Sequence, residues 1–257
     1  MSVLEALAIF AAGMAAGTIN TIVGSGTLVT FPTLLFFGYP PVVANMSNSV
    51  GLVAGGITGV HGYRAELRGQ AHVLKRLIPA SLVGSVGGAL LLLVLPPEAF
   101  QTIVPVLIGL SVLLVVVGPW LQRKLAKAHG EQDPVPQGRI RLAVLLGGIL
   151  FAGAYGGYFG AAQGVLLMGL MSVLMTESLQ RINGYKNVLG MVANAVAAVV
   201  FMLVAWDDIS WIAAGLIAAG ALVGGYIGAH VGRRLPPWAL RGVIVVIGVA
   251  AIVNLLS

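Results

Sequence analysis

Between Glu5 and Arg64 the chain contains no Asp, Glu, Lys or Arg. A membrane-spanning helix needs about 20 consecutive, mostly apolar residues, so this stretch alone has room for more than two spans. The rest of the chain is similar, because 58% of all 257 residues are hydrophobic and only 9% are charged. Soluble domains carry about 25% charged residues. The composition therefore excludes a soluble domain and predicts a polytopic membrane protein.

Breaks that are charged or rich in Pro or Gly divide the chain into apolar segments. They lie at residues 6–23, 27–38, 42–63, 77–95, 101–121, 141–159, 163–176, 187–206, 209–230 and 238–256. A segment in lipid must satisfy its own backbone hydrogen bonds, and these segments are too long and too uniformly apolar for barrel strands, so we expect an all-α protein. All are long enough to span except 27–38 and 163–176. Each short segment follows a glycine-rich break, which predicts short or re-entrant half-helices.

The positions of the basic residues predict an orientation in the membrane. All 14 Lys and Arg residues fall in four loops, at residues 64–76, 123–141, 181–186 and 233–241. The intervening turns, 95–101 and 206–210, contain acidic residues and no base. Cytoplasmic loops are the ones enriched in Lys and Arg, so we expect all four basic loops in the cytoplasm and both termini outside. This explains the net charge of +6, and no basic helix with interleaved aromatics suggests a nucleic-acid partner. The first five residues contain one acid, Glu5, and no Lys or Arg. A cleaved signal peptide begins with a positively charged region, so we expect the first segment to be retained.

Weak internal similarity predicts two related halves. Residues 48–54 and 187–193 share the pattern Asn-x-x-Gly-x-Val-Ala at an offset of 139, and both Leu-Val-Gly and Leu-Pro-Pro recur at an offset of 140. The first Leu-Pro-Pro falls at an outside turn and the second at an inside turn, so the halves have opposite orientation. We therefore predict two inverted-topology repeats, each with a glycine-broken helical hairpin plus three transmembrane helices. The repeats cover residues 1–121 and 141–257, and residues 122–140 form a flexible cytoplasmic linker.

The glycine breaks are also the best candidates for a binding site. Transporters of this design hold substrate near the bilayer midplane, where the N-termini of broken helices point at anionic groups. Glycine lets the backbone approach a ligand closely, and amide and hydroxyl side chains near the breaks can donate hydrogen bonds to an anion. We expect a site built from Asn20, Gly24, Ser25, Gly26, Thr27, Asn48, Gly160, Gln163, Gly164 and Asn187. The alternatives are that the small residues only allow close helix packing and that the asparagines cap helices or bond between them.

Other polar residues suggest less. Lys186 would be the cation nearest to a midplane anion, but its place in a basic loop favours a role in setting orientation. Glu177 and the four histidines are expected at loops or helix ends, so no buried carboxylate is available to bind a cation. The absence of cysteine excludes thiolate metal sites, and we expect neither a metal nor a cofactor. No metalloprotease, hydrolase or Walker motif is present, so we expect neither an enzyme nor an ATP-driven pump.

The order of motifs resembles a known family. Val23-Gly24-Ser25-Gly26-Thr27 is followed by Pro32, by Gly38-Tyr39-Pro40-Pro41, by Asn48-Ser49 and by the basic loop at Arg64, and Phe159-Gly160 opens the second break. This order is similar to that of the TauE/SafE family of sulfite and organosulfonate exporters, over nearly the whole chain. The resemblance implies a secondary transporter of the cytoplasmic membrane that exports a small sulfur oxyanion by alternating access without ATP. A transporter of another small anion or solute, and a membrane scaffold or accessory subunit, stay open as alternatives, as does homo-oligomerisation.

Overall fold

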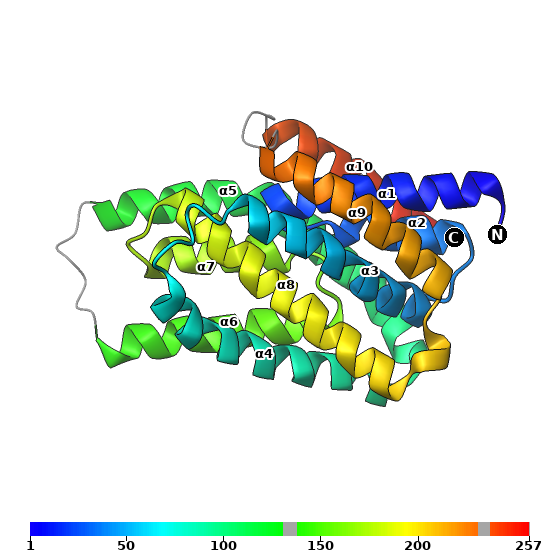
Figure 1. Cartoon of the computed structure of the whole chain (residues 1–257), viewed down its shortest axis with the longest axis horizontal. Helices are drawn as coiled ribbons and strands as arrows, with labels where there is room; N and C mark the ends of the chain where they lie inside the picture. Colours follow the sequence, from blue (N-terminus) through cyan, green and yellow to red (C-terminus); the bar gives the residue numbers. More distant parts are fainter. Residues whose placement is uncertain (131–137, 231–236, 257) are drawn as a thin grey trace.

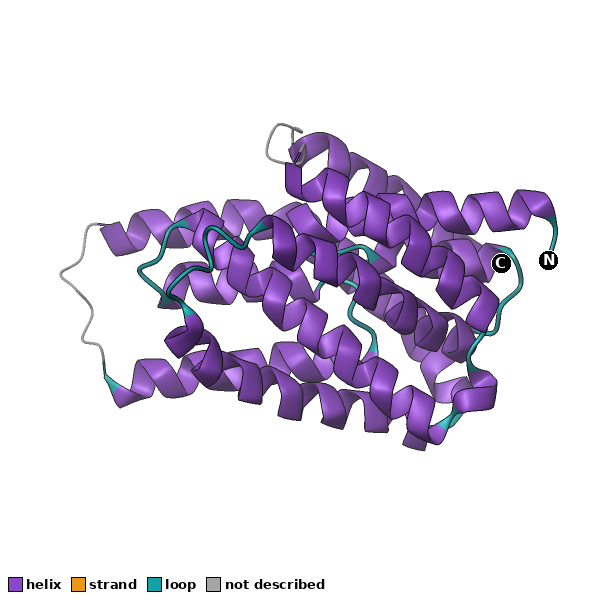
Figure 2. Cartoon of the chain, viewed as in Figure 1, coloured by secondary structure: helices purple, strands orange, loops and turns teal. Residues whose placement is uncertain are grey.

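The computed structural model describes residues 1–130, 138–230 and 237–256, and every regular element in them is helical (Figure 2). The prediction of an all-α fold is confirmed. The helices are α1 (Val3–Ile22), α2 (Thr27–Phe36), α3 (Pro41–Gly62), α4 (Ala71–Val94), α5 (Pro97–Gly130), α6 (Arg139–Tyr158), α7 (Gln163–Leu174), α8 (Leu179–Val204), the short 3-10 helix η1 (Trp206–Asp208), α9 (Trp211–His230) and α10 (Pro237–Leu256).

Helix lengths match the predicted division into long and short segments. The helices α2 and α7 have 10 and 12 residues, and every other described α-helix has at least 20. With a rise of about 1.5 Å per residue, the short helices reach roughly 15 to 18 Å, about half of a hydrocarbon core roughly 30 Å thick. Six helices in the described residues are both long and apolar enough to cross a membrane: α1, α4, α5, α6, α8 and α9. The chain is therefore a multi-pass membrane protein.

The glycine breaks interrupt the helices as predicted. Gly24, between α1 and α2, has a φ of +86°, and Gly160, between α6 and α7, has a φ of +73°. L side chains rarely adopt this left-handed conformation, so glycine lets each chain end one helix and turn at once into the next. One boundary differs from the prediction: α5 continues to Gly130, so the first part of the segment expected as a linker is helical. Residues 131–137 of that segment lie outside the described residues.

Two long helix pairs join the first half of the chain to the second. The helix α1 packs along α9, and α4 packs along α6. Both contacts bring backbone against backbone, since a Cβ atom added at Gly224 would lie 1.9 Å from the carbonyl oxygen of Met14, and one added at Gly88 would lie 1.9 Å from that of Ala154. Small residues drive such close packing in lipid, where burying apolar surface gives no net gain. The pairs α2 with α10 and α7 with α5 also bring the two halves together.

The central helices α3 and α8 cross in opposite directions (Figure 1). Asn183 Nδ2 donates a hydrogen bond of 2.6 Å to the hydroxyl of Tyr63. Earlier along α3 and later along α8, a Cβ atom added at Gly56 would lie 2.9 Å from Cγ of Met191. Residue numbers therefore rise along one helix as they fall along the other. The start of α1 and the end of α10 lie at one end of the bundle, and the loops 63–70 and 175–178 lie at the opposite end (Figure 1).

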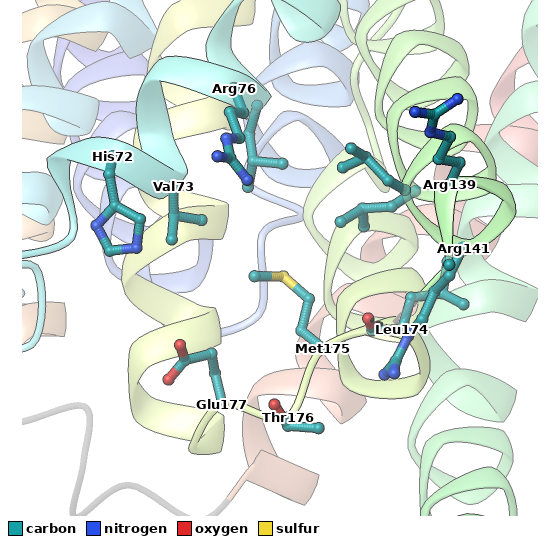
Figure 3. A pocket seen from close by; sticks show the side chains of 13 residues that line it. His72, Val73, Arg76, Arg139, Arg141, Leu174, Met175, Thr176 and Glu177 are labelled. Atoms are coloured by element: carbon teal, nitrogen blue, oxygen red, sulfur yellow. Dashed lines mark hydrogen bonds between the residues drawn. The ribbon is translucent and has the colours of Figure 1, made fainter. Parts of the chain in front are cut away.

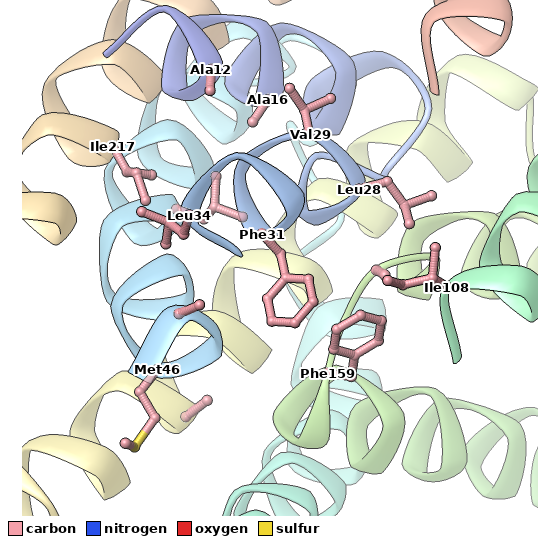
Figure 4. Close-up of a cluster of buried hydrophobic side chains, with 14 of the residues drawn as sticks. Ala12, Ala16, Leu28, Val29, Phe31, Leu34, Met46, Ile108, Phe159 and Ile217 are labelled. Atoms are coloured by element: carbon pink, nitrogen blue, oxygen red, sulfur yellow. The ribbon is translucent and has the colours of Figure 1, made fainter. Parts of the chain in front are cut away.

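A buried aromatic cluster fixes α2 against the rest of the molecule. Phe31 of α2 is fully buried and makes edge-on contacts with Phe159, at 5.2 Å between ring centroids, and with Phe100 of α5, at 6.4 Å. Edge-on aromatic pairs add about 0.5–1.5 kcal/mol beyond the burial of their surface. Because Phe159 directly precedes Gly160, this cluster holds the short helix of the first half beside the glycine break of the second (Figure 4).

Candidate functional site

The two glycine breaks are in direct contact. The backbone N–H of Gly164 donates a hydrogen bond of 3.1 Å to the carbonyl oxygen of Gly24. A Cβ atom added at Gly24 would lie 2.4 Å from Cα of Gly164, and one added at Gly164 would lie 2.4 Å from Cα of Gly24. Neither position can therefore carry a side chain without moving the backbone of the other half. The starts of both short helices are held at one point by this contact.

A small polar cavity lies beside this contact, among α1, α2, α3, α7 and α8. Its volume is ≈ 20 Å³, which is room for about one water molecule. The residues that line it are Asn20, Thr21, Gly24, Thr27, Gly55, Gly56, Gly160, Gln163, Gly164, Lys186, Asn187, Gly190, Met191 and Asn194. No Asp or Glu is among them.

The cavity collects most of the residues expected at a site. Asn20, Gly24, Thr27, Gly160, Gln163, Gly164 and Asn187 line it. Ser25, Gly26 and Asn48 do not. Ser25 is completely buried, and its hydroxyl has no hydrogen-bond partner within the described part of the chain. Gly26 packs against α1, where an added Cβ atom would lie 2.5 Å from the carbonyl oxygen of Ala16.

Asn48 lies behind the cavity and bonds to α2. Its Nδ2 donates to the hydroxyl of Thr27 over 3.1 Å, and its Oδ1 accepts a hydrogen bond from the hydroxyl of Thr30. The bonding between helices that the sequence left open as an alternative is therefore what Asn48 does in this structure. It also has a consequence for Thr27. Because the Thr27 oxygen accepts from Asn48, its own O–H is left to donate to another acceptor.

The starts of the two short helices and the amide of Gln163 also lie at the cavity. Neither α2 nor α7 has a side-chain hydrogen bond at its N-cap, which is Gly26 in one case and Ala162 in the other. The first N–H groups of a helix carry a partial positive charge, although those of Gln163 and Gly164 already donate to the carbonyl oxygens of Gly160 and Gly24. Gln163, the first residue of α7, is 4% exposed, and its Nε2 has no hydrogen-bond partner among the described residues. A buried amide that donates to nothing is costly, so a ligand that accepts hydrogen bonds would stabilise it.

Lys186 brings a buried amino group to the cavity. It is 2% exposed, and its Nζ donates to the carbonyl oxygens of Asn20, at 3.1 Å, and Thr21, at 3.0 Å, in the last turn of α1. Asn187 Nδ2 also donates to Thr21, at 3.2 Å. Together they satisfy the free carbonyl groups at the end of that helix. Within the described residues, no carboxylate forms an ion pair with Lys186.

The expected position of Lys186 in a basic loop was wrong. The helix α8 begins at Leu179, where the side chain of Ser178 accepts a hydrogen bond from the backbone N–H of Arg181. The helix thus starts eight residues before the apolar segment predicted from residue 187. This N-cap carries Arg181 and Lys186 into the helix, and Lys186 falls on its buried side.

Other lining residues follow Asn187 at a helical spacing that is visible in the sequence. Gly190, Met191 and Asn194 follow Asn187 on α8 at spacings of three, four and seven, which place side chains on one face of a helix. Met191 has a second role, because it also lines an open groove of ≈ 620 Å³ with Ile57, Val60, His61, Arg64, Leu67 and Arg68. It is the one residue common to the linings of the groove and the central cavity as described here.

Comparison with known proteins agrees with this architecture. The model of the family described as sulfite exporter TauE/SafE matches residues 9–255. A probable membrane transporter protein of Haemophilus influenzae is 26% identical over 247 residues, which cover 95% of this chain and 91% of the relative. The probable membrane transporter protein YfcA of Escherichia coli K12 is 28% identical over 230 residues, 88% of this chain and 79% of the relative. No solved structure matches the chain. With its family match over nearly the whole length, the chain belongs to the TauE/SafE sulfite exporter family of membrane transporters.

Proposed function

We propose that this chain is a secondary transporter, not an enzyme, and that it carries sulfite or an organosulfonate out of the cytoplasm by alternating access. The observation that carries the proposal is the buried amino group of Lys186 at a cavity lined by amides, hydroxyls and glycines and by no carboxylate. Burying a charge without a partner is expensive, and intramembrane charges mark substrate pathways. A bound anion would supply the missing negative charge.

The hydrogen-bonding capacity that remains at the cavity suits an oxyanion. An ammonium group has three donors, and Lys186 uses two of them on the end of α1. The amide of Gln163 and the hydroxyl of Thr27 also have donors to spare. Transport of cations usually recruits intramembrane Asp or Glu. The donors thus favour an anion, and membership in a family described as sulfite exporters favours a sulfur oxyanion among them.

The small size of the cavity supports a change of conformation during transport. A volume of ≈ 20 Å³ holds about one water molecule, which is too little for sulfite, so the helices around the cavity must separate to admit it. The inverted repeat supplies a route, since two halves of opposite orientation can rock about a fixed central site. The antiparallel crossing of α3 and α8 supports this repeat, as do the exchanged pairs α1 with α9 and α6 with α4.

The orientation is proposed from charge. The start of α1 and the end of α10 lie at the end of the bundle opposite the loops 63–70 and 175–178 (Figure 1). Positively charged loops stay in the cytoplasm, and Arg64 and Arg68 belong to the first of these loops. We therefore place both termini outside the cytoplasm.

Counterflow of labelled sulfite in proteoliposomes tests the function. We expect the wild-type protein to exchange sulfite and Lys186→Gln to lose this exchange. Lys75→Gln, which removes an exposed charge from α4, is the control and should exchange sulfite normally. Competition by sulfate, sulfoacetate and acetate then defines the substrate. Equal inhibition by all three would refute selection of a sulfur oxyanion, and no exchange by correctly folded wild-type protein would favour a scaffold.

A further inference from the structure

A second cavity lies at the end of the bundle that carries the loops 63–70 and 175–178. It has a volume of ≈ 440 Å³ and lies between the first turns of α4, the first turns of α6 and the segment that joins α7 to α8 (Figure 3). The residues that line it are His72, Val73, Arg76, Leu77, Gly138, Arg139, Arg141, Leu142, Leu145, Leu174, Met175, Thr176 and Glu177. It shares no lining residue with the central cavity.

The polar lining of this second cavity carries an excess of positive charge. Three arginines line it from two different helices, Arg76 from α4 and Arg139 and Arg141 from α6 (Figure 3). The one lining carboxylate, Glu177, is already paired with Arg181, at 2.5 Å between Oε2 and Nη1. Within the described residues, Arg76 and Arg139 form no ion pair. Guanidinium groups present several donors in a plane and suit phosphate oxygens, so the charge is arranged for an anion that bears phosphate.

One of the three guanidinium groups is fixed in place by the backbone. Arg141 Nε donates a hydrogen bond of 2.9 Å to the carbonyl oxygen of Leu174, the last residue of α7. This bond satisfies a carbonyl group at the end of a helix and still leaves the two terminal nitrogens of Arg141 free to bind. A side chain that is already held loses less conformational entropy when it binds a ligand.

Most of the remaining lining is apolar. Leu77 and Leu145 belong to a buried cluster, and Val73, Leu142 and Leu174 complete the apolar side. The helices α4 and α6 both qualify as membrane spans by length and composition, and the cavity lies at their first turns, where a spanning helix would meet the membrane interface. Basic pockets between transmembrane helices at the cytoplasmic side bind anionic lipid headgroups. A soluble phosphate would use the arginines but leave the apolar side exposed.

We infer that this cavity binds an anionic phospholipid, with its phosphate at Arg76, Arg139 and Arg141 and its glycerol and first acyl carbons against Leu142 and Leu145. A lipid bound there would connect α4 of the first half to α6 of the second. It would also contact the segment leading into α8, the helix that carries Lys186. The inference does not depend on which solute the central cavity transports.

Lipid-induced stabilisation of the full-length protein tests the inference. The purified protein is titrated with phosphatidylglycerol or phosphatidylcholine in detergent, and lipid binding is counted by native mass spectrometry alongside thermal unfolding. We expect phosphatidylglycerol to bind in preference to phosphatidylcholine. Arg76→Gln and Arg139→Gln should each weaken phosphatidylglycerol binding about fivefold, as loss of one interfacial basic residue predicts. Lys75→Gln removes the same charge from the neighbouring position of α4, outside the cavity lining, and should have little effect.

Further titrations distinguish a phospholipid from a soluble phosphate as the ligand of this cavity. Inorganic phosphate and glycerol 1-phosphate are added in place of lipid, and we expect neither to stabilise the protein as phosphatidylglycerol does. Equal stabilisation by these soluble phosphates would overturn the lipid as the occupant. Equal binding of both lipids, or equal weakening by Lys75→Gln and Arg76→Gln, would overturn the site itself. The two arginine variants act from separate helices, so misfolding of one leaves the other as a test.

Discussion

The amide of Asn48 donates a hydrogen bond of 3.1 Å to the hydroxyl of Thr27, and only Thr27 of this pair lines the central cavity. Because the hydroxyl oxygen of Thr27 accepts this bond, its O–H group can donate to a different acceptor. Asn48 is therefore a positioning residue: it orients a donor for the proposed anion without touching the anion itself. The distinction separates Asn48 from Asn187, which lines the cavity directly.

This arrangement predicts non-additive substitutions. Thr27→Val and Asn48→Ala should each raise the KM for sulfite about fivefold, which corresponds to roughly 1 kcal/mol for one hydrogen bond. Combining them should raise the KM little further, because Asn48 acts through the hydroxyl that Thr27→Val already removes. Proteoliposome flux gives the KM values, and Asn187→Ala combined with Thr27→Val serves as the additive control. Additive effects of Thr27→Val and Asn48→Ala would show that Asn48 acts by another route.

The contact between Gly24 and Gly164 makes a prediction about stability. Gly24→Ala should lower the free energy of unfolding by about 2–5 kcal/mol, combining roughly 1–2 kcal/mol for a left-handed alanine with roughly 1–3 kcal/mol for overpacking. Gly38→Ala is a matched control, because Gly38 has a φ of +84° and no atom within 4 Å of an added Cβ. Gly38→Ala should lower the free energy of unfolding only by the backbone contribution of roughly 1–2 kcal/mol. Denaturant unfolding in micelles measures both, and equal losses would argue that the close approach is unimportant.

The extent of each helix was largely predictable, and α8 shows where prediction failed. Thr27 and Gln163 begin α2 and α7 where the glycine breaks placed them. Arg181 and Lys186 looked like loop residues because their charges are costly in lipid. In the structure Lys186 meets the free carbonyls of α1 from the other half of the chain. A contact between residues more than 160 positions apart leaves no local pattern in the sequence.

The weak similarity between the halves shows a second limit. Asn48 and Asn187 occupy matching positions of the similar segments, and both were expected at the binding site. In the structure Asn48 bonds to α2 of its own half, whereas Asn187 bonds to α1 of the other half. Similarity within a chain gives the position of a residue along its helix. The neighbours that its side chain meets depend on packing between the halves.

Substitutions of Gln163 test whether the charge at the central cavity controls anion binding. Gln163→Glu should abolish sulfite transport, because a carboxylate at the cavity would repel the anion and pair with the nearby Lys186 charge. Gln163→Leu removes the donors without adding charge, and it should weaken transport less. Counterflow in proteoliposomes compares the two variants. Transport by Gln163→Glu at the level of Gln163→Leu would mean that the substrate carries no negative charge at this position.

Met191 lines both the central cavity and the groove that contains Arg64 and Arg68. We therefore expect its side chain to act as a barrier between the two. The chain has no cysteine, and Asn194→Cys would place a single thiol at the cavity. A small anionic thiol reagent should label this cysteine slowly, because the cavity, at ≈ 20 Å³, is too small to admit it. Adding Met191→Ala should raise the labelling rate several-fold. Val192→Ala, on the same helix but outside both linings, should leave the rate unchanged, and equal rates in all three backgrounds would place the barrier elsewhere.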